Sequence, residues 1–186
     1  MKKYLSSLLI VFMVSGGLLA AEAEKPARNV AFTVNPLSMI FLRPSFNFQL
    51  GVSDKIALVF PFHVQFMVGS VTATNNNSSA SSSSNVFGVG GGIGAKFFIT
   101  GRTFEDSLYF QPVAEVGWLG VGKANFVTVS GSAIIGYGWV FDSGLSLNLG
   151  LGIQYVYINS TIKSSDSTVA FNAVFPDGEL SLGYAW

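Results

Sequence analysis

The stretch LSLNLGLGIQYVY, from Leu145 to Tyr157, has two faces of opposite character. Every second position from Leu145 carries a large apolar or aromatic side chain, and the positions between are mainly Ser, Asn, Gly and Gln. Successive side chains of a β-strand point to opposite sides of the sheet, so this period of two predicts a strand with one apolar and one small, polar face. Its length exceeds the roughly 9–11 residues that a strand needs to cross a bilayer.

The same alternation recurs through the rest of the chain and predicts eight strands, at about 29–37, 44–52, 56–68, 86–98, 107–119, 126–140, 145–158 and 174–186. Short turns at 53–55, 100–106 and 142–144 alternate with longer links at 38–43, 69–85, 120–125 and 159–173. This order predicts an all-β fold, a single antiparallel up-and-down barrel with both termini at the short-turn end.

Two connections have features of their own. The segment 69–85 contains an Asn triplet and a run of Ser, a low-complexity composition that predicts a surface loop. Pro176-Asp177-Gly178 predicts a bulge or turn that leaves a last strand of about eight residues.

Composition excludes several functions. Formal net charge is zero, so no electrostatic field would attract nucleic acid. The chain has no Cys and one His, which argues against disulfides, thiolate chemistry and a multi-ligand metal centre. We therefore expect no cofactor and no nucleic-acid partner.

The orientation of the two faces decides between a water-soluble barrel and a membrane barrel. Charged residues make up 11% of the chain, against about 25% in a typical soluble domain. Only Lys96, Glu115 and Glu179 place a charge inside a predicted strand, and most other charges, Asp177 among them, fall in predicted connections. A face made of Gly, Ser, Thr, Asn and Gln suits a narrow lumen, so the sequence predicts apolar side chains pointing outward into lipid.

Aromatic residues gather toward the strand ends, as expected of anchors at the two membrane interfaces. Those at the short-turn end are Phe97, Tyr137, Trp139, Tyr184 and Trp186, and those at the long-link end are Phe66, Phe87, Trp118, Phe126, Tyr155 and Tyr157.

The first residues predict a signal peptide over 1–23, followed by a barrel over 24–186. Lys2 and Lys3 precede an apolar stretch from Leu5 to Leu19, and Ala21-Glu22-Ala23 fits a small-x-small cleavage site.

With these features the chain resembles the small eight-stranded outer-membrane barrels of Gram-negative bacteria, the OmpA-, OmpX- and OmpW-like group. The C-terminal residues Leu180, Leu182, Tyr184 and Trp186 match the alternating, aromatic-ended strand that the barrel-assembly machinery reads in that group. Trp186 stands where Phe is commoner, and Ser181 where Gly is often found. The resemblance implies a monomer in the outer membrane with outer-membrane lipid as its partner.

Candidate chemistry lies on the inward face. His63, Glu115 and Glu179 are predicted to share one level of the lumen, with Lys96 nearer the short turns, and with Gln65, Gln111 and Gln154 they would form a hydrogen-bonded plug. A gate for small solutes is the alternative. Lipid-modifying barrel enzymes of the deacylase type carry a His-x-Ser pair, and His63-Val64-Gln65 lacks it.

The expected function is therefore that of a non-enzymatic, surface-exposed structural barrel with a largely filled lumen. A narrow conduit for small or hydrophobic solutes, as the OmpW-like resemblance implies, is the alternative, and a lipid-modifying enzyme comes third. An apolar ligand cavity would be lined by Ala57, Val59, Met67, Val113, Val156 and Ile158.

Overall fold

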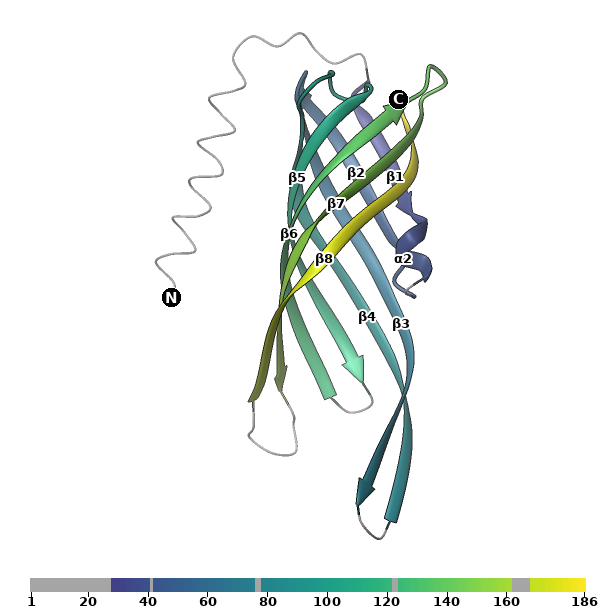
Figure 1. Cartoon of the computed structure of the whole chain (residues 1–186), viewed down its shortest axis with the longest axis vertical. Helices are drawn as coiled ribbons and strands as arrows, with labels where there is room; N and C mark the ends of the chain where they lie inside the picture. The colour runs from purple at the N-terminus through teal and green to yellow at the C-terminus, as the bar shows by residue number, and fades with distance from the viewer. Residues whose placement is uncertain (1–27, 41, 76–77, 122–123, 162–167) are drawn as a thin grey trace, which may run out of the picture.

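The computed structural model describes residues 28–40, 42–75, 78–121, 124–161 and 168–186, so the predicted signal peptide lies outside the described residues. Eight antiparallel strands close into one barrel in chain order (Figure 1), which confirms the predicted fold. The elements are β1 (Val30–Asn35), α2 (Pro36–Ile40), β2 (Ser45–Ser53), β3 (Ile56–Asn75), β4 (Ser78–Phe98), β5 (Ser107–Val121), β6 (Ala124–Val140), β7 (Leu145–Thr161) and β8 (Thr168–Ala185). In the described part of the chain, no helix is long and apolar enough to span a membrane.

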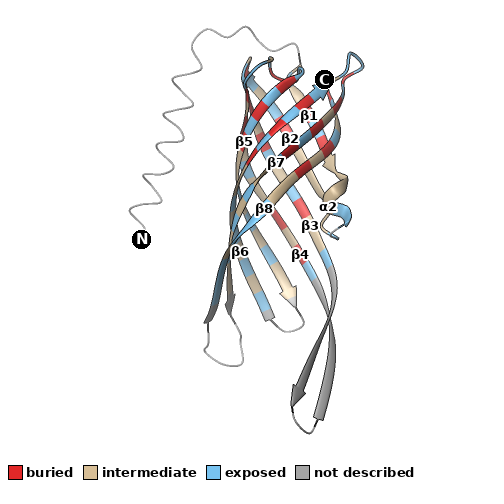
Figure 2. Cartoon of the chain, in the orientation of Figure 1, coloured by how far each residue is buried: buried red, intermediate tan, exposed pale blue. Residues whose placement is uncertain are grey.

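The barrel carries its apolar face outward. Along β7, Leu145, Leu149 and Leu151 are exposed, whereas Ser146 and Asn148 are buried. Figure 2 shows the buried residues gathered mostly toward the end that carries the C-terminus and the short turns. The barrel therefore has apolar side chains on its outer face and polar side chains inside, as the sequence predicts.

The polar segment predicted as a loop at 69–85 is largely strand. β3 and β4 stay in register beyond the rest of the barrel, from Val68↔Asn85 to Asn75↔Ser78, and form the long hairpin at the foot of Figure 1. The loop prediction was wrong because ladder hydrogen bonds join backbone groups and need no apolar side chains. For the same reason the strands run into the predicted links at 120–125 and 159–173.

The predicted bulge at Pro176 is also absent. The pairs Ile153↔Pro176, Gly152↔Asp177 and Leu151↔Gly178 follow one register. The Trp186 N–H donates to the Val30 carbonyl of β1. Backbone N–H groups alternate sides along a strand, so those of even-numbered residues in β8 point to the β1 side. The backbone nitrogen of Pro176 therefore points away from β7. Proline there interrupts no β7–β8 hydrogen bond, and β8 continues through it.

β1 is short and pairs with each of its neighbours over few residues. Four residue pairs, Ala31↔Ala185 to Val34↔Leu182, join β1 to β8, and the β1–β2 pairing ends at Asn35↔Ser45. Beyond that point the chain forms α2, which lies against β8, and then runs beside β3. There the Val64 N–H donates to the Pro44 carbonyl (3.0 Å), and the Phe66 N–H to the Leu42 carbonyl (2.9 Å).

We expect Leu182→Pro to prevent barrel closure. Proline at this position removes an N–H that points at β1, within the short ladder that closes the ring. Leu180→Pro is the matched control: its N–H points the same way, but lies beyond the last β1–β8 pair.

The measurement is electrophoresis of boiled and unboiled protein refolded in detergent. Leu182→Pro is expected to lose the distinct band of the folded barrel and Leu180→Pro to keep most of it. Equal folding yields of the two variants would contradict this account of closure.

Candidate functional site

A chain of hydrogen bonds fills the lumen at the short-turn end. Lys96 Nζ donates to Asn148 Oδ1 (2.7 Å), and Asn148 Nδ2 donates to Ser181 Oγ (3.0 Å). Glu179 accepts from both sides, from the Ser181 hydroxyl (2.8 Å) and from the Tyr109 hydroxyl (2.7 Å). These five buried residues, here called the lumen network, tie β4, β5, β7 and β8 together across the barrel axis.

The ammonium group of Lys96 has a second partner. Its Nζ lies 3.7 Å from the centroid of the Tyr109 ring, within the range of a cation–π interaction. Lys96 is only 1% exposed, so its charge is removed from water and depends on these contacts. Glycine makes room for the ring: a Cβ on Gly150 would lie 2.9 Å from the Tyr109 hydroxyl oxygen.

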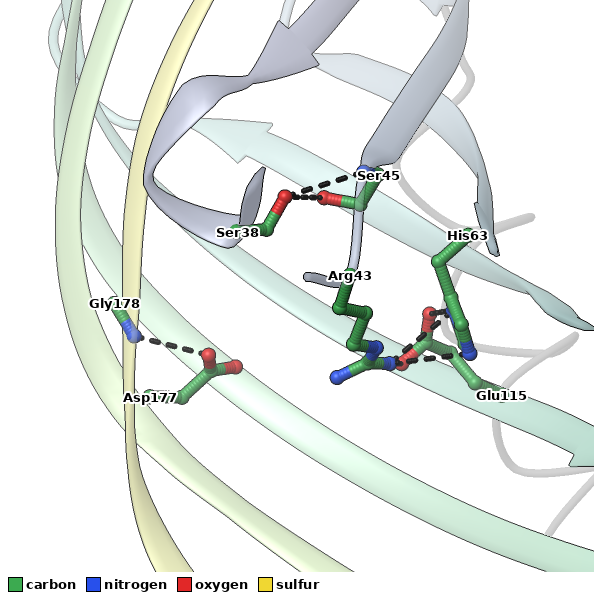
Figure 3. Close-up of polar contacts among 7 residues, drawn as sticks. All are labelled: Ser38, Arg43, Ser45, His63, Glu115, Asp177 and Gly178. Atoms are coloured by element: carbon green, nitrogen blue, oxygen red, sulfur yellow. Dashed lines mark hydrogen bonds and ion pairs between the residues drawn. The ribbon is translucent and has the colours of Figure 1, made fainter. Parts of the chain in front are cut away.

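A second group of charges lies farther from the short turns. Arg43 Nη2 is 3.2 Å from His63 Nδ1 and 3.5 Å from Glu115 Oε2, and His63 Nδ1 is 3.3 Å from Glu115 Oε1. Figure 3 shows these three side chains, the Arg43 cluster, converging from the segment before β2, from β3 and from β5. His63 lies against the backbone of Gly90, where any Cβ would collide with the imidazole ring.

The predicted single level of charges is thus divided in two. His63 and Glu115 meet as expected, but Glu179 belongs with Lys96 in the lumen network. Asp177, predicted in a connection, lies within β8 and faces the lumen, because the strand continues through Pro176.

Four partners were missed by sequence reasoning, among them Asn148, which was placed on the inner face of its strand but not in the plug. Arg43 lies in the link between the first two strands, where no periodicity gives a direction. Tyr109 was overlooked because large aromatic residues were expected outside, yet it shares parity with Gln111 and Glu115, a signal that would have found it. Ser181 was considered only as part of the C-terminal motif.

Between the two groups lies a cavity of about 310 Å³, the lumen cavity. Its wall includes Arg43, Gln111, Glu115, Gln154, Asp177 and Glu179. Around Lys96 and Asn148, nearer the short turns, the free space is only about 10 Å³, so the lumen network forms a floor.

The predicted apolar lining is mostly absent from this cavity. Val113 belongs to the wall, but Ala57 and Val59 are fully buried elsewhere and Val156 and Ile158 do not line it. The side chain of Met67 lies outside the described residues. Eleven of the cavity's seventeen lining residues carry polar side chains, and Ser38 and Arg43 come from the link between β1 and β2.

The aromatic residues lie outside the barrel in clusters near both ends. Toward the short turns, Tyr137 contacts Trp139 with tilted rings (4.9 Å between centroids), and Tyr184 stacks on Trp186 (6.1 Å). At the other end Phe87 contacts Phe66 (5.5 Å) and Trp118 (6.4 Å). Tyr155 and Tyr157 are also exposed there. The prediction was wrong for Phe126, which alternates with the exposed Val127 and Val129 and so has the parity of the inner face.

The residues that the structure describes include no group of three or more His, Asp or Glu placed to hold a metal ion. Compared with known proteins, the chain matches no family model, no curated protein and no solved structure.

We expect Tyr109→Phe to lower the free energy of unfolding by about 1.5–3 kcal/mol, because it removes a hydroxyl donor from a buried carboxylate. Urea unfolding of the refolded barrel measures the change. Tyr137→Phe, the same substitution on the outer face, is expected to change it by less than about 0.5 kcal/mol. Equal changes in the free energy of unfolding for the two variants would mean that the Tyr109–Glu179 hydrogen bond does not stabilise the barrel.

Proposed function

We propose that the protein is an integral outer-membrane β-barrel whose outer wall contacts lipid, and that it acts as a non-enzymatic, surface-exposed structural protein. The observation that carries the proposal is the outward apolar face. Soluble monomers rarely expose contiguous apolar patches larger than a few hundred Å², whereas here Val116, Ile135, Leu151 and Ile153 all exceed half exposure on adjoining strands.

Two further features support a membrane setting. A closed barrel pairs its strands without free edges, which is the requirement for β-structure in hydrocarbon. The outer aromatic clusters occupy both ends of the wall, where Trp and Tyr favour the interface. The resemblance to small outer-membrane barrels then assigns the short turns and termini to the periplasm and the long β3–β4 hairpin to the outside.

A non-enzymatic role agrees with the surroundings of His63. An imidazole base needs a nucleophile within hydrogen-bond reach, and in the described part of the chain His63 contacts Arg43 and Glu115 instead. The lumen network supports a closed pore rather than the alternative conduit, because it leaves almost no free space across the axis. Single-channel recording in planar bilayers distinguishes them: steady conductance would favour the conduit.

We expect Leu151→Arg to destabilise the barrel in lipid vesicles by about 2–4 kcal/mol, since its side chain is the most exposed apolar group of β7 and would carry charge into hydrocarbon. Leu145→Arg, at the first position of β7, is expected to cost about 0–1 kcal/mol near the interface.

Equilibrium unfolding in vesicles measures both variants. Equal stabilities of Leu151→Arg and wild type would mean that this wall faces water, and the membrane proposal would fail with it.

A further inference from the structure

We propose that the turn between β4 and β5 is a stopper that closes the lumen at the short-turn end, with the ring of Phe104 as the seal. This closure is separate from the lumen network and can open while the network stays intact. The inference goes beyond lipid contact by the outer wall, because it rests only on contacts at the inner end of the barrel.

The turn places an aromatic side chain inside the barrel. Phe104 lies between the end of β4 and the start of β5, and it is only 4% exposed. Its ring packs edge-on against Phe98, with 6.0 Å between the centroids. Both rings belong to one buried cluster with three alanines from β1, β3 and β8, namely Ala31, Ala57 and Ala185. The ring is therefore surrounded by strands from both edges of the closed sheet.

The wall of the barrel leaves space for this ring at one glycine. Gly51 alternates with the buried Gln49 and Ser53 along β2, so it faces the lumen. A Cβ on Gly51 would lie 3.3 Å from Phe104 Cε2 and 3.1 Å from Thr103 Cγ2. The absence of a side chain at Gly51 thus allows the turn to approach the wall closely.

Hydrogen bonds hold the tip of the turn against the β2–β3 turn. The Thr103 N–H donates to the Asp54 carbonyl (2.7 Å), and the Thr103 hydroxyl donates to the Ser53 carbonyl (2.6 Å). Lys55 Nζ donates to the Gly101 carbonyl (2.7 Å). These bonds fix the tip in the position that keeps Phe104 in the lumen.

Arg28 connects the stopper to the third short turn. Its Nη1 donates to the Phe104 carbonyl (3.5 Å), and its Nη2 donates to the carbonyls of Phe141 (3.2 Å) and Asp142 (3.0 Å). The three short turns are thereby joined around the end of the barrel.

The backbone of Phe104 is strained. Its φ is 59°, in the left-handed region that bulky residues rarely adopt. Such a conformation persists only where surrounding contacts enforce it, and here these contacts are the buried ring and the bonds of Thr103. Withdrawal of the ring would relieve the strain, which favours local release of the turn without unfolding of the barrel.

The stopper separates bulk water from a small buried space of about 10 Å³. Phe104, Lys96, Ser146 and Asn148 are among the residues that line this space. Ser146 is only 4% exposed, and its hydroxyl has no hydrogen-bond partner among the described residues. Ser146→Cys therefore introduces a thiol behind the seal without breaking a hydrogen bond.

The test is the reactivity of this thiol in the refolded full barrel in detergent micelles. The chain has no cysteine of its own, so Ser146→Cys supplies a single reporter. The probe is the water-soluble reagent 2-sulfonatoethyl methanethiosulfonate, and mass spectrometry follows its addition. We expect slow labelling when Phe104 is present and labelling roughly tenfold faster or more in Phe104→Gly. Glycine adopts the left-handed conformation without strain, so this substitution removes the ring and leaves the turn its shape.

Two controls distinguish loss of the seal from general loosening. Phe141→Gly removes an exposed ring from the β6–β7 turn and is expected to leave labelling of Ser146→Cys unchanged. Ser132→Cys places the thiol in the wall of the lumen cavity, on the other side of the floor, and its labelling rate is expected to be the same with and without the Phe104 ring.

Thr103→Val is a second variant, which loses the bond to the Ser53 carbonyl but keeps the ring. It is expected to speed labelling of Ser146→Cys roughly two- to tenfold through more frequent release of the turn. Unchanged labelling in Phe104→Gly would overturn the proposal, as would unchanged labelling in Thr103→Val if Phe104→Gly gives no folded band on gels. Equal acceleration at Ser132→Cys would overturn it as well. Stability in vesicles is measured separately, so these outcomes leave the membrane proposal standing.

Discussion

Closure of the ring between the first and last strands is the constraint on which the rest of the structure depends. The ladder is short, from Ala31↔Ala185 to Val34↔Leu182, and the terminal residue reinforces it. The Trp186 carbonyl accepts the N–H groups of Asn29 (3.0 Å) and Val30 (3.1 Å), and the Trp186 N–H donates to Val30 in return (2.9 Å). Only a closed ring has an inside, so the separation of apolar from polar side chains follows from these few bonds.

A narrow ring must then be filled. Large inward side chains fit because glycine stands across from them, as Gly90 does for His63 and Gly150 for Tyr109. Buried charges are tolerated because each is placed against an opposite charge or a hydrogen-bonding dipole, Lys96 against Asn148 and Glu179 against Tyr109. The glycine-rich alternation therefore has a packing role, and the small residues and the long polar ones are two parts of one arrangement.

Sequence periodicity predicted what depends on side-chain alternation. The eight strands, their antiparallel order and the outward apolar face all follow from period-two patterns such as that of Leu145 to Tyr157. Periodicity failed to predict strands that are held by backbone hydrogen bonds alone. The ladder through the Ser and Asn tract at 78–85 forms regardless of side-chain polarity. It failed again at Pro176, since the cost of a missing N–H depends on which side of the strand it faces. The position of Arg43 could not be predicted, because side-chain alternation gives no direction for a residue in a connection between strands.

The first hairpin explains why the lumen differs between its two halves. Where β1 and β2 are paired, near the short turns, the ring is complete and the lumen network fills it. Where they part after Asn35↔Ser45, α2 and the residues after it take the place of two strands, held by the Ser38 hydroxyl, which donates to the Asn35 carbonyl (2.6 Å). This segment enters the wall of the cavity and carries Arg43 to Glu115. A longer β1–β2 ladder would place alternate residues of the segment on the outer face, and the cavity wall would lose part of this segment's contribution. Early separation of the first two strands thus creates a polar recess above a closed floor within one barrel.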